Sequence, residues 1–198
     1  MTRNYNFHYP ISAASHYNRA VICFDNVFSF ADGSHLFYSA LELRNCIERF
    51  LFEYLVLIQI GEENLEKFRN SYRVKSFSMA IYESEPEFDK KLEFTNFYLQ
   101  TIGAHFTIPK LDEKALNSYY GKLGNYLHNF KRPDETVQNQ EWWNNFILFI
   151  QETKSYLSEY LNVPRAFFKM NDKGLLLYQE YKNENISRDE IRAKILQG

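Results

Sequence analysis

The chain has 198 residues and a formal net charge of −2. This balance excludes the overall positive charge of a protein that coats nucleic acid, although a local basic groove stays open. Apolar residues make up 45% and aromatic residues 18% of the chain, which suffices for a substantial core, and only 7 Gly and 5 Pro argue against a turn-rich all-β fold.

Apolar residues at three- and four-residue steps predict a mainly α-helical protein. The predicted helices cover residues 11–24, 35–60, 63–72, 85–102, 112–129 and 139–161. Ser12 and Asp112 are the expected N-caps of the first and fifth helices. Ser84 and Glu87 form an S-x-x-E capping box with Pro86 in the first turn. Residues 73–82 are ambiguous, because their apolar positions partly alternate as in a strand.

The sequence pattern over residues 165–198 differs from that of the predicted helices before it. Residues 166–170 and 175–181 read as two short strands, and the Asn-Asp-Lys-Gly sequence at 171–174 is typical of a turn. A second capping box, Ser187 with Glu190, opens a short C-terminal helix. We therefore expect a bundle of four to five helices over 1–164 and a small C-terminal β-hairpin and helix over 165–198. A lone hairpin is marginally stable, so this appendage is expected to dock a partner or a second protomer.

The helix that ends near residue 129 contains the sequence YYGKLGNYLHNF. Each glycine in a helix interior costs about 1 kcal/mol relative to alanine. Asn117, Gly121, Gly124 and His128 follow steps of four, three and four and so share one stripe, with Asn125 beside it. The stripe predicts close packing of another helix or access for something small, with packing alone as the simpler alternative.

Arg44 and Glu48 are four residues apart on the longest helix, on the face that also carries Leu41 and Leu51. Charges on such a face are paired, or they line a cleft. If the two helices are neighbours, Arg44 and Glu48 can cluster with Asn125 and His128. The plainer alternative is a helix salt bridge with a packed or capping histidine.

Several chemistries find no support in the sequence. There is no phosphate-binding loop, no dinucleotide fingerprint, no His-Glu-x-x-His and no Cys-x-x-Cys, so we expect neither cofactor nor metal. A thiol site would need Cys23 or Cys46 beside His16 or His128, and the spacing does not indicate one. The cysteine usage, the lack of a signal-peptide pattern and an apolar run at 50–60 too short for a bilayer predict a cytoplasmic protein without a membrane partner.

Two segments carry a resemblance to a known family. ALELRNCIE at 40–48 and YGKLGNYLH at 120–128 resemble the HEPN-like helical proteins of bacteria, over about residues 34–161. The resemblance implies a helical bundle and a role in a defence, toxin–antitoxin or stress system. In catalytic members, an Arg-x(4–6)-His motif near a helix end forms a metal-independent RNase site, usually at a dimer interface. Here Lys122 holds the place of that arginine, with five residues between it and His128.

Two functions follow as hypotheses. The first is a non-catalytic interaction or dimerisation subunit, a homodimer or the companion of another protein. The alternative is a metal-independent endoribonuclease with His128 as general acid or base. In that enzyme, Lys122 and Arg44 would stabilise phosphorane charge, Asn125 would orient the histidine or the phosphate, and Glu48 would hold Arg44. Lys131 and Arg132, two cations of the loop after the His128 helix, would contact the phosphates of the RNA substrate. A third hypothesis is a helical bundle that binds a small molecule or a nucleotide.

Overall fold

The computed structural model describes residues 11–58, 74–128, 138–163, 170–184 and 186–197, and these residues contain eight helices and no strand. The mainly α-helical prediction is therefore confirmed for them. The chain divides into two compact units, Met1–Leu51 with Lys114–Leu157 and Phe52–Glu113 with Ser158–Gly198. The predicted domain boundary after residue 164 stays a prediction.

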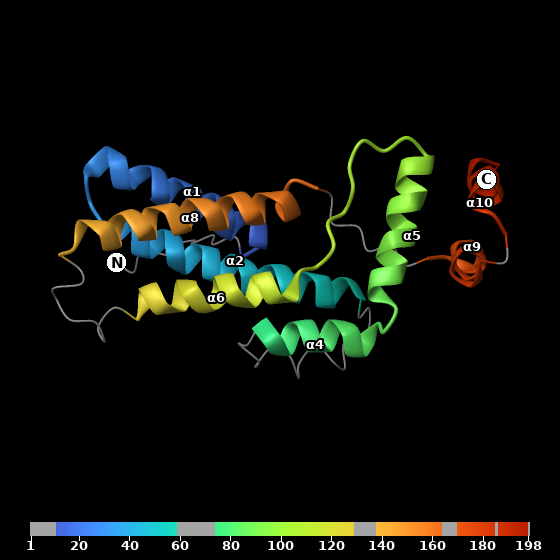
Figure 1. Cartoon of the computed structure of the whole chain (residues 1–198), viewed down its shortest axis with the longest axis horizontal. Helices are drawn as coiled ribbons and strands as arrows, with labels where there is room; N and C mark the ends of the chain where they lie inside the picture. The colour runs from blue at the N-terminus through green and yellow to red at the C-terminus, as the bar shows by residue number, and fades with distance from the viewer. Residues whose placement is uncertain (1–10, 59–73, 129–137, 164–169, 185, 198) are drawn as a thin grey trace, which may run out of the picture. The chain divides into compact units, whose positions relative to one another are not determined.

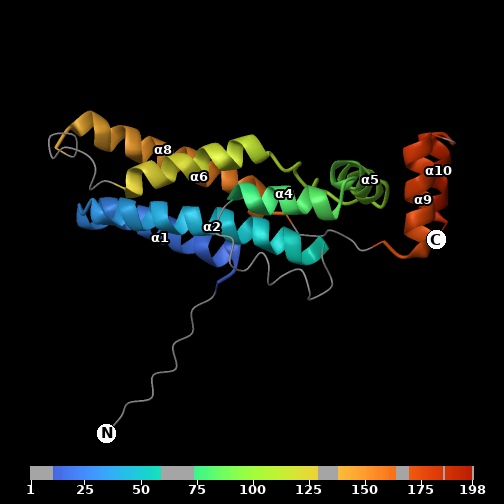
Figure 2. The same ribbon diagram turned by 90° about the horizontal axis from the view of Figure 1, so that it is seen from below.

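The first unit is an antiparallel bundle of four helical segments (Figures 1 and 2). It consists of α1 (Ala13–Phe30), most of α2 (Ser34–Ile58), most of α6 (Glu113–Leu127) and most of α8 (Gln140–Leu161). Helices α1 and α6 run opposite to α2 and α8 (Figure 2). Its buried apolar side chains come from all four helices and include Phe24, Leu36, Leu43, Ile47, Leu116, Leu123, Phe146 and Ile150.

Aromatic contacts join the helices of this bundle. The rings of Tyr126 on α6 and Phe146 on α8 stack at 4.1 Å, nearly parallel at 3°. Phe37 on α2 meets Phe146 edge-on at 5.4 Å. These contacts place α6 and α2 against the same stretch of α8. The position of Tyr120, six residues before Tyr126 on α6, is therefore set by core packing.

Helix α1 begins as predicted, because the Ser12 hydroxyl accepts a hydrogen bond from the Ser15 amide at 3.1 Å. The predicted end at Phe24 is wrong, since the helix continues to Phe30. Val27 is buried one turn after Phe24 and extends the apolar stripe, so the packing that supports the helix does not stop at Phe24. The helices predicted at 35–60, 112–129 and 139–161 correspond to α2, α6 and α8; residues 59–60 and 129 lie outside the described ranges.

The second unit contains α4 (Val74–Ser84), α5 (Phe88–Thr101), α9 (Asp172–Asn183) and α10 (Arg188–Leu196). The ambiguous segment 73–82 is thus helical from Val74. The capping box predicted at Ser84 is wrong: Ser84 is the last residue of α4, and α5 begins after Glu87, which makes no side-chain cap bond. The Glu87 carboxylate instead bonds to Tyr178 and Lys182. The helix predicted at 63–72 lies outside the described residues.

The predicted C-terminal β-hairpin is wrong where the structure describes it. Residues 175–181 belong to α9, and Met170 is in no strand; residues 166–169 lie outside the described ranges. Asn171, expected in a turn, is the N-cap of α9 and accepts from the Gly174 amide at 2.8 Å. Tyr178 and Tyr181 both contact Phe94, and their three-residue separation is the repeat of a helix face rather than of a strand. The Ser187–Glu190 capping box of α10 is confirmed.

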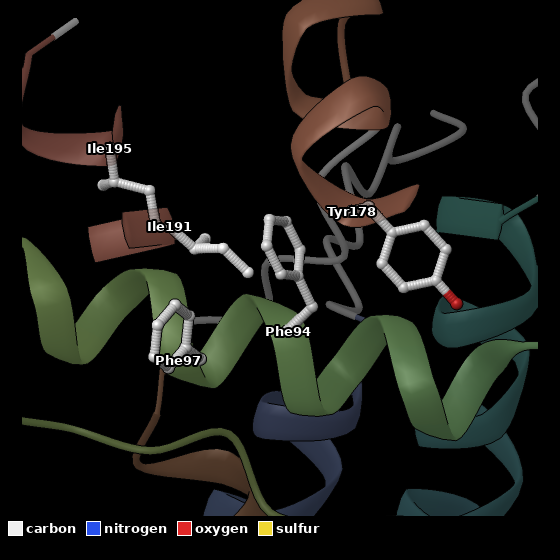
Figure 3. Close-up of a cluster of buried hydrophobic side chains, with 5 residues drawn as sticks. All are labelled: Phe94, Phe97, Tyr178, Ile191 and Ile195. Carbon is white, nitrogen blue, oxygen red and sulfur yellow. The ribbon is translucent and has the colours of Figure 1, made fainter. Parts of the chain in front are cut away.

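Helices α5, α9 and α10 share one hydrophobic core. Figure 3 shows its buried side chains, which are Phe94, Phe97, Tyr178, Ile191 and Ile195. Phe94 projects from α5 toward the other two helices (Figure 3). This cluster explains how two helices of 12 and 9 residues are held, because helices of that length are marginal in water without a packed face.

Candidate functional site

The predicted Arg44–Glu48 pair meets α6 at Tyr120. The Tyr120 hydroxyl accepts a hydrogen bond from Arg44 Nη2 at 2.7 Å and donates one to Glu48 Oε1 at 2.5 Å. Arg44 Nε lies 3.9 Å from the same carboxylate oxygen. The Arg44 guanidinium carbon is also 4.3 Å from the centre of the Tyr120 ring. Three side chains from two helices thus form one polar cluster, which we call the Tyr120 cluster.

The Tyr120 cluster is only partly open to water. The side chains of Arg44 and Glu48 are 27% and 24% exposed. Burial raises the pKa of the Tyr120 phenol, and the hydrogen bond to Glu48 raises it further, whereas the bond from Arg44 acts in the opposite direction. The phenol therefore stays protonated at neutral pH and acts as a hydrogen-bond donor to Glu48.

The Arg44 side chain lies against Gly124, in the space beside the position that a Cβ would occupy. A Cβ at Gly124 would lie 3.3 Å from Arg44 Nη1, tighter than ordinary contact. The predicted close packing along the glycine stripe is therefore found at Gly124, although a side chain rather than a helix backbone approaches it. A Cβ at Gly121 would meet nothing within 4 Å, and Gly121 is exposed. Packing does not explain the second glycine.

The other residues of the predicted RNase site lie on the surface. Lys122, Asn125 and His128 are all exposed. Lys122 Nζ lies 5.6 Å from the centre of the Phe149 ring. Among the interactions of the described residues, none joins the His128 side chain to Arg44 or Lys122. The two predicted RNA-contacting cations, Lys131 and Arg132, lie outside the described residues. The assignment of catalytic roles stays a prediction.

The sequence reasoning missed Tyr120 as the centre of this arrangement. It precedes Gly124 by four residues, so both lie on one helix face. A tyrosine one turn from a buried glycine, opposite an Arg–Glu pair, was the available signal. The partner helix could not be identified from periodicity alone, because periodicity gives the face of a helix and not its neighbour.

A second polar cluster joins α1 to α2. His16 is 8% exposed, and its Nδ1 lies 2.6 Å from Glu42 Oε2. Arg19 Nε is 3.1 Å from the same oxygen, and Arg19 Nη2 is 2.8 Å from His16 Nδ1. One ring nitrogen cannot donate to Glu42 and accept from Arg19 at once. The 2.6 Å contact favours Nδ1 as the donor to Glu42. The same carboxylate forms an ion pair with Arg19.

Cys23 lies on α1 near this second cluster. Burial raises the pKa of its thiol, and the negative charge of Glu42 raises it further against the opposing effect of Arg19. A thiol with a raised pKa is a poor nucleophile at neutral pH. Cys46 is buried. Neither cysteine has the electropositive, open surroundings of a reactive thiolate.

Within the described ranges, no group of three or more His, Cys, Asp or Glu side chains is placed to hold a metal ion. None of the described helices combines the length and apolar character needed to cross a bilayer.

Comparison with protein-family models, with curated proteins and with solved structures finds no match to this chain. The class that its own structure defines is a mainly α-helical protein whose bundle carries a polar cluster between α2 and α6.

Proposed function

We propose that this protein is a non-catalytic, HEPN-like interaction or dimerisation subunit of a bacterial defence or stress system. The proposal rests on the contacts of the Arg44 side chain. Its guanidinium is bonded to Tyr120 and paired with Glu48, so it is engaged in joining two helices. A phosphoryl-transfer site needs a cation aimed at the developing charge beside the general acid or base. The system role rests on the sequence resemblance alone.

An exposed aromatic surface at one end of the bundle supports an interaction role. Phe28, Phe30 and Tyr38 are 61%, 68% and 56% exposed, around the turn between α1 and α2. The centre of the His35 ring lies 5.9 Å from that of Phe30 and 6.4 Å from that of Tyr38, so the rings of Phe30, His35 and Tyr38 are adjacent. We call Phe30, His35 and Tyr38 the aromatic edge. Clustered large apolar side chains on a surface mark interaction sites, and aromatic residues are enriched there. The family resemblance implies a dimer, so the proposed occupant is a second copy of this chain.

Sedimentation equilibrium over a range of protein concentrations tests this proposal. The wild type is expected to dimerise, and Phe30→Ser combined with Tyr38→Ser is expected to weaken dimerisation by about tenfold or more, because aromatic anchors carry much of the energy of an interface. The matched control is Leu148→Ser, which removes an apolar side chain of similar exposure, 61%, from α8. A wild type that stays monomeric, or equal weakening by the control, rejects dimerisation through the aromatic edge.

The second candidate is the metal-independent endoribonuclease, and one observation favours it. His128 and Asn125 are exposed at the end of α6, so both can reach a substrate phosphate, and Lys122 is exposed on the same helix. His128 would transfer the proton of the attacking 2′-hydroxyl or of the leaving oxygen. Lys122 would supply a point charge without the bidentate fork of an arginine.

Cleavage of a mixed RNA panel in EDTA tests the enzyme. The wild type is compared with His128→Ala and with His105→Ala, which removes an exposed histidine of the second unit. Cleavage lost only in His128→Ala establishes the endoribonuclease and removes the non-catalytic proposal. If the RNA stays intact in the presence of folded wild-type protein, the endoribonuclease hypothesis is rejected.

A further inference from the structure

The second unit contains a cavity of about 320 Å³ between α5, α9 and α10. Its wall is mostly apolar, and two residues of the core cluster, Phe94 and Ile195, line it. Tyr98, Met170 and Leu177 complete the apolar wall. The volume is at the lower end of the range for small-molecule sites, which are mostly apolar with a few polar groups that fix orientation.

The residues that line this cavity and are charged at neutral pH are of one sign. They are Lys173, in the first turn of α9, and Lys194, in the last turn of α10; none of the described lining residues is Asp or Glu. Both lysines are exposed, so their ammonium groups lie at the rim rather than in the apolar interior. An apolar wall with a cationic rim is complementary to a ligand with an apolar body and an anionic end.

Lys194 is bonded to Glu180, which lines the neighbouring hollow and not this one. The ammonium group has three N–H donors, and the two bonds to the Glu180 oxygens, 2.6 and 2.8 Å, use two of them. The pair is exposed, and exposed pairs are weak, so an incoming carboxylate can share the ammonium group or replace Glu180.

We propose that this cavity binds an apolar carboxylate of the fatty-acid type. The hydrocarbon part would cover Phe94, Leu177 and Ile195, and the carboxylate would lie at the rim with Lys173 and Lys194. This inference is independent of the proposed function, because it uses other residues in the other unit.

Calorimetric titration of the full chain with decanoate, below its micellar concentration, tests the proposal. One saturable site is expected, and decanol and decyltrimethylammonium of the same chain length are expected to bind about tenfold or more weakly. Amide chemical shifts should move at Phe94, Leu177 and Ile195. Absence of saturable binding, or equal binding of the cationic analogue, overturns the proposal.

A charge-reversed pair separates the site from nonspecific attraction. Lys173→Glu with Lys194→Glu is expected to weaken decanoate binding about tenfold or more. The control, Lys90→Glu with Lys114→Glu, makes the same change in net charge at exposed lysines that do not line this cavity. Equal weakening in both double variants overturns the proposal, and circular dichroism confirms that each is folded.

Discussion

Tyr120 on α6 and Glu48 on α2 are joined by a hydrogen bond of 2.5 Å between segments 72 residues apart in the chain. The same hydroxyl accepts from Arg44. Tyr120→Phe removes the hydroxyl oxygen. Two partly buried charged side chains, Arg44 and Glu48, then lose their hydrogen bonds to it. We expect a loss of about 1–2 kcal/mol in the free energy of unfolding, measured by urea denaturation.

Tyr119→Phe is the matched control for that measurement. The Tyr119 hydroxyl donates to Glu152 at 2.8 Å, but this bond is exposed. Water replaces an exposed hydrogen bond at little cost, so we expect a change within about 0.5 kcal/mol. Equal losses in the two variants would contradict a special role for the Tyr120 cluster.

The two glycines of α6 should respond differently to substitution by alanine. At Gly121 a Cβ meets open space, so Gly121→Ala is expected to stabilise the protein by about 0.5–1 kcal/mol through helix propensity. At Gly124 the same gain is opposed by displacement of Arg44, which Tyr120 and Glu48 hold in place. We expect Gly124→Ala to be the less stable of the two variants in thermal unfolding. Equal stabilisation would show that Arg44 moves freely.

Glu87 links α9 to the start of α5. The hydrogen bond from Lys182 lowers the pKa of Glu87 most, and the one from Tyr178 lowers it further. A lowered folded-state pKa gives stability that is present above the unfolded value, about 4.3, and is lost as the pH falls below it. We expect acidification through this range, or Glu87→Gln at neutral pH, to increase hydrogen exchange at the α9 amides. Glu83→Gln, at an exposed residue of α4, should leave that exchange unchanged.

The second unit should lose stability in alkali. Burial raises the pKa of Tyr54 and of Tyr82 to about 12. Unfolded tyrosine ionises near pH 10, so the stabilisation is complete below about pH 10 and is lost as the pH rises from there toward about 12. Urea denaturation at increasing pH should show the decline, and Tyr82→Phe should make it shallower. The same slope in both proteins would contradict the assignment.

The sequence predicts helices well where a buried stripe and a cap coincide. Ser12 and the Ser187–Glu190 box are confirmed because a cap is a contact between residues two or three apart. It fails at 175–181, where LLLYQEY fits a buried strand as well as a helix. Tyr178 and Tyr181 pack together on Phe94, which lies far away in the chain, and this long-range contact decides between the two.

The sequence by itself determined the helical class, most helix positions and the pairing of Arg44 with Glu48, because these depend on periodicity and on spacing within one helix. Only the tertiary structure decided that Tyr120 lies between them, that Gly124 makes room for Arg44, and that His128 stays on the surface. The physical reason is that local spacing sets which side chains share a face, whereas the core packing of four helices sets which faces meet.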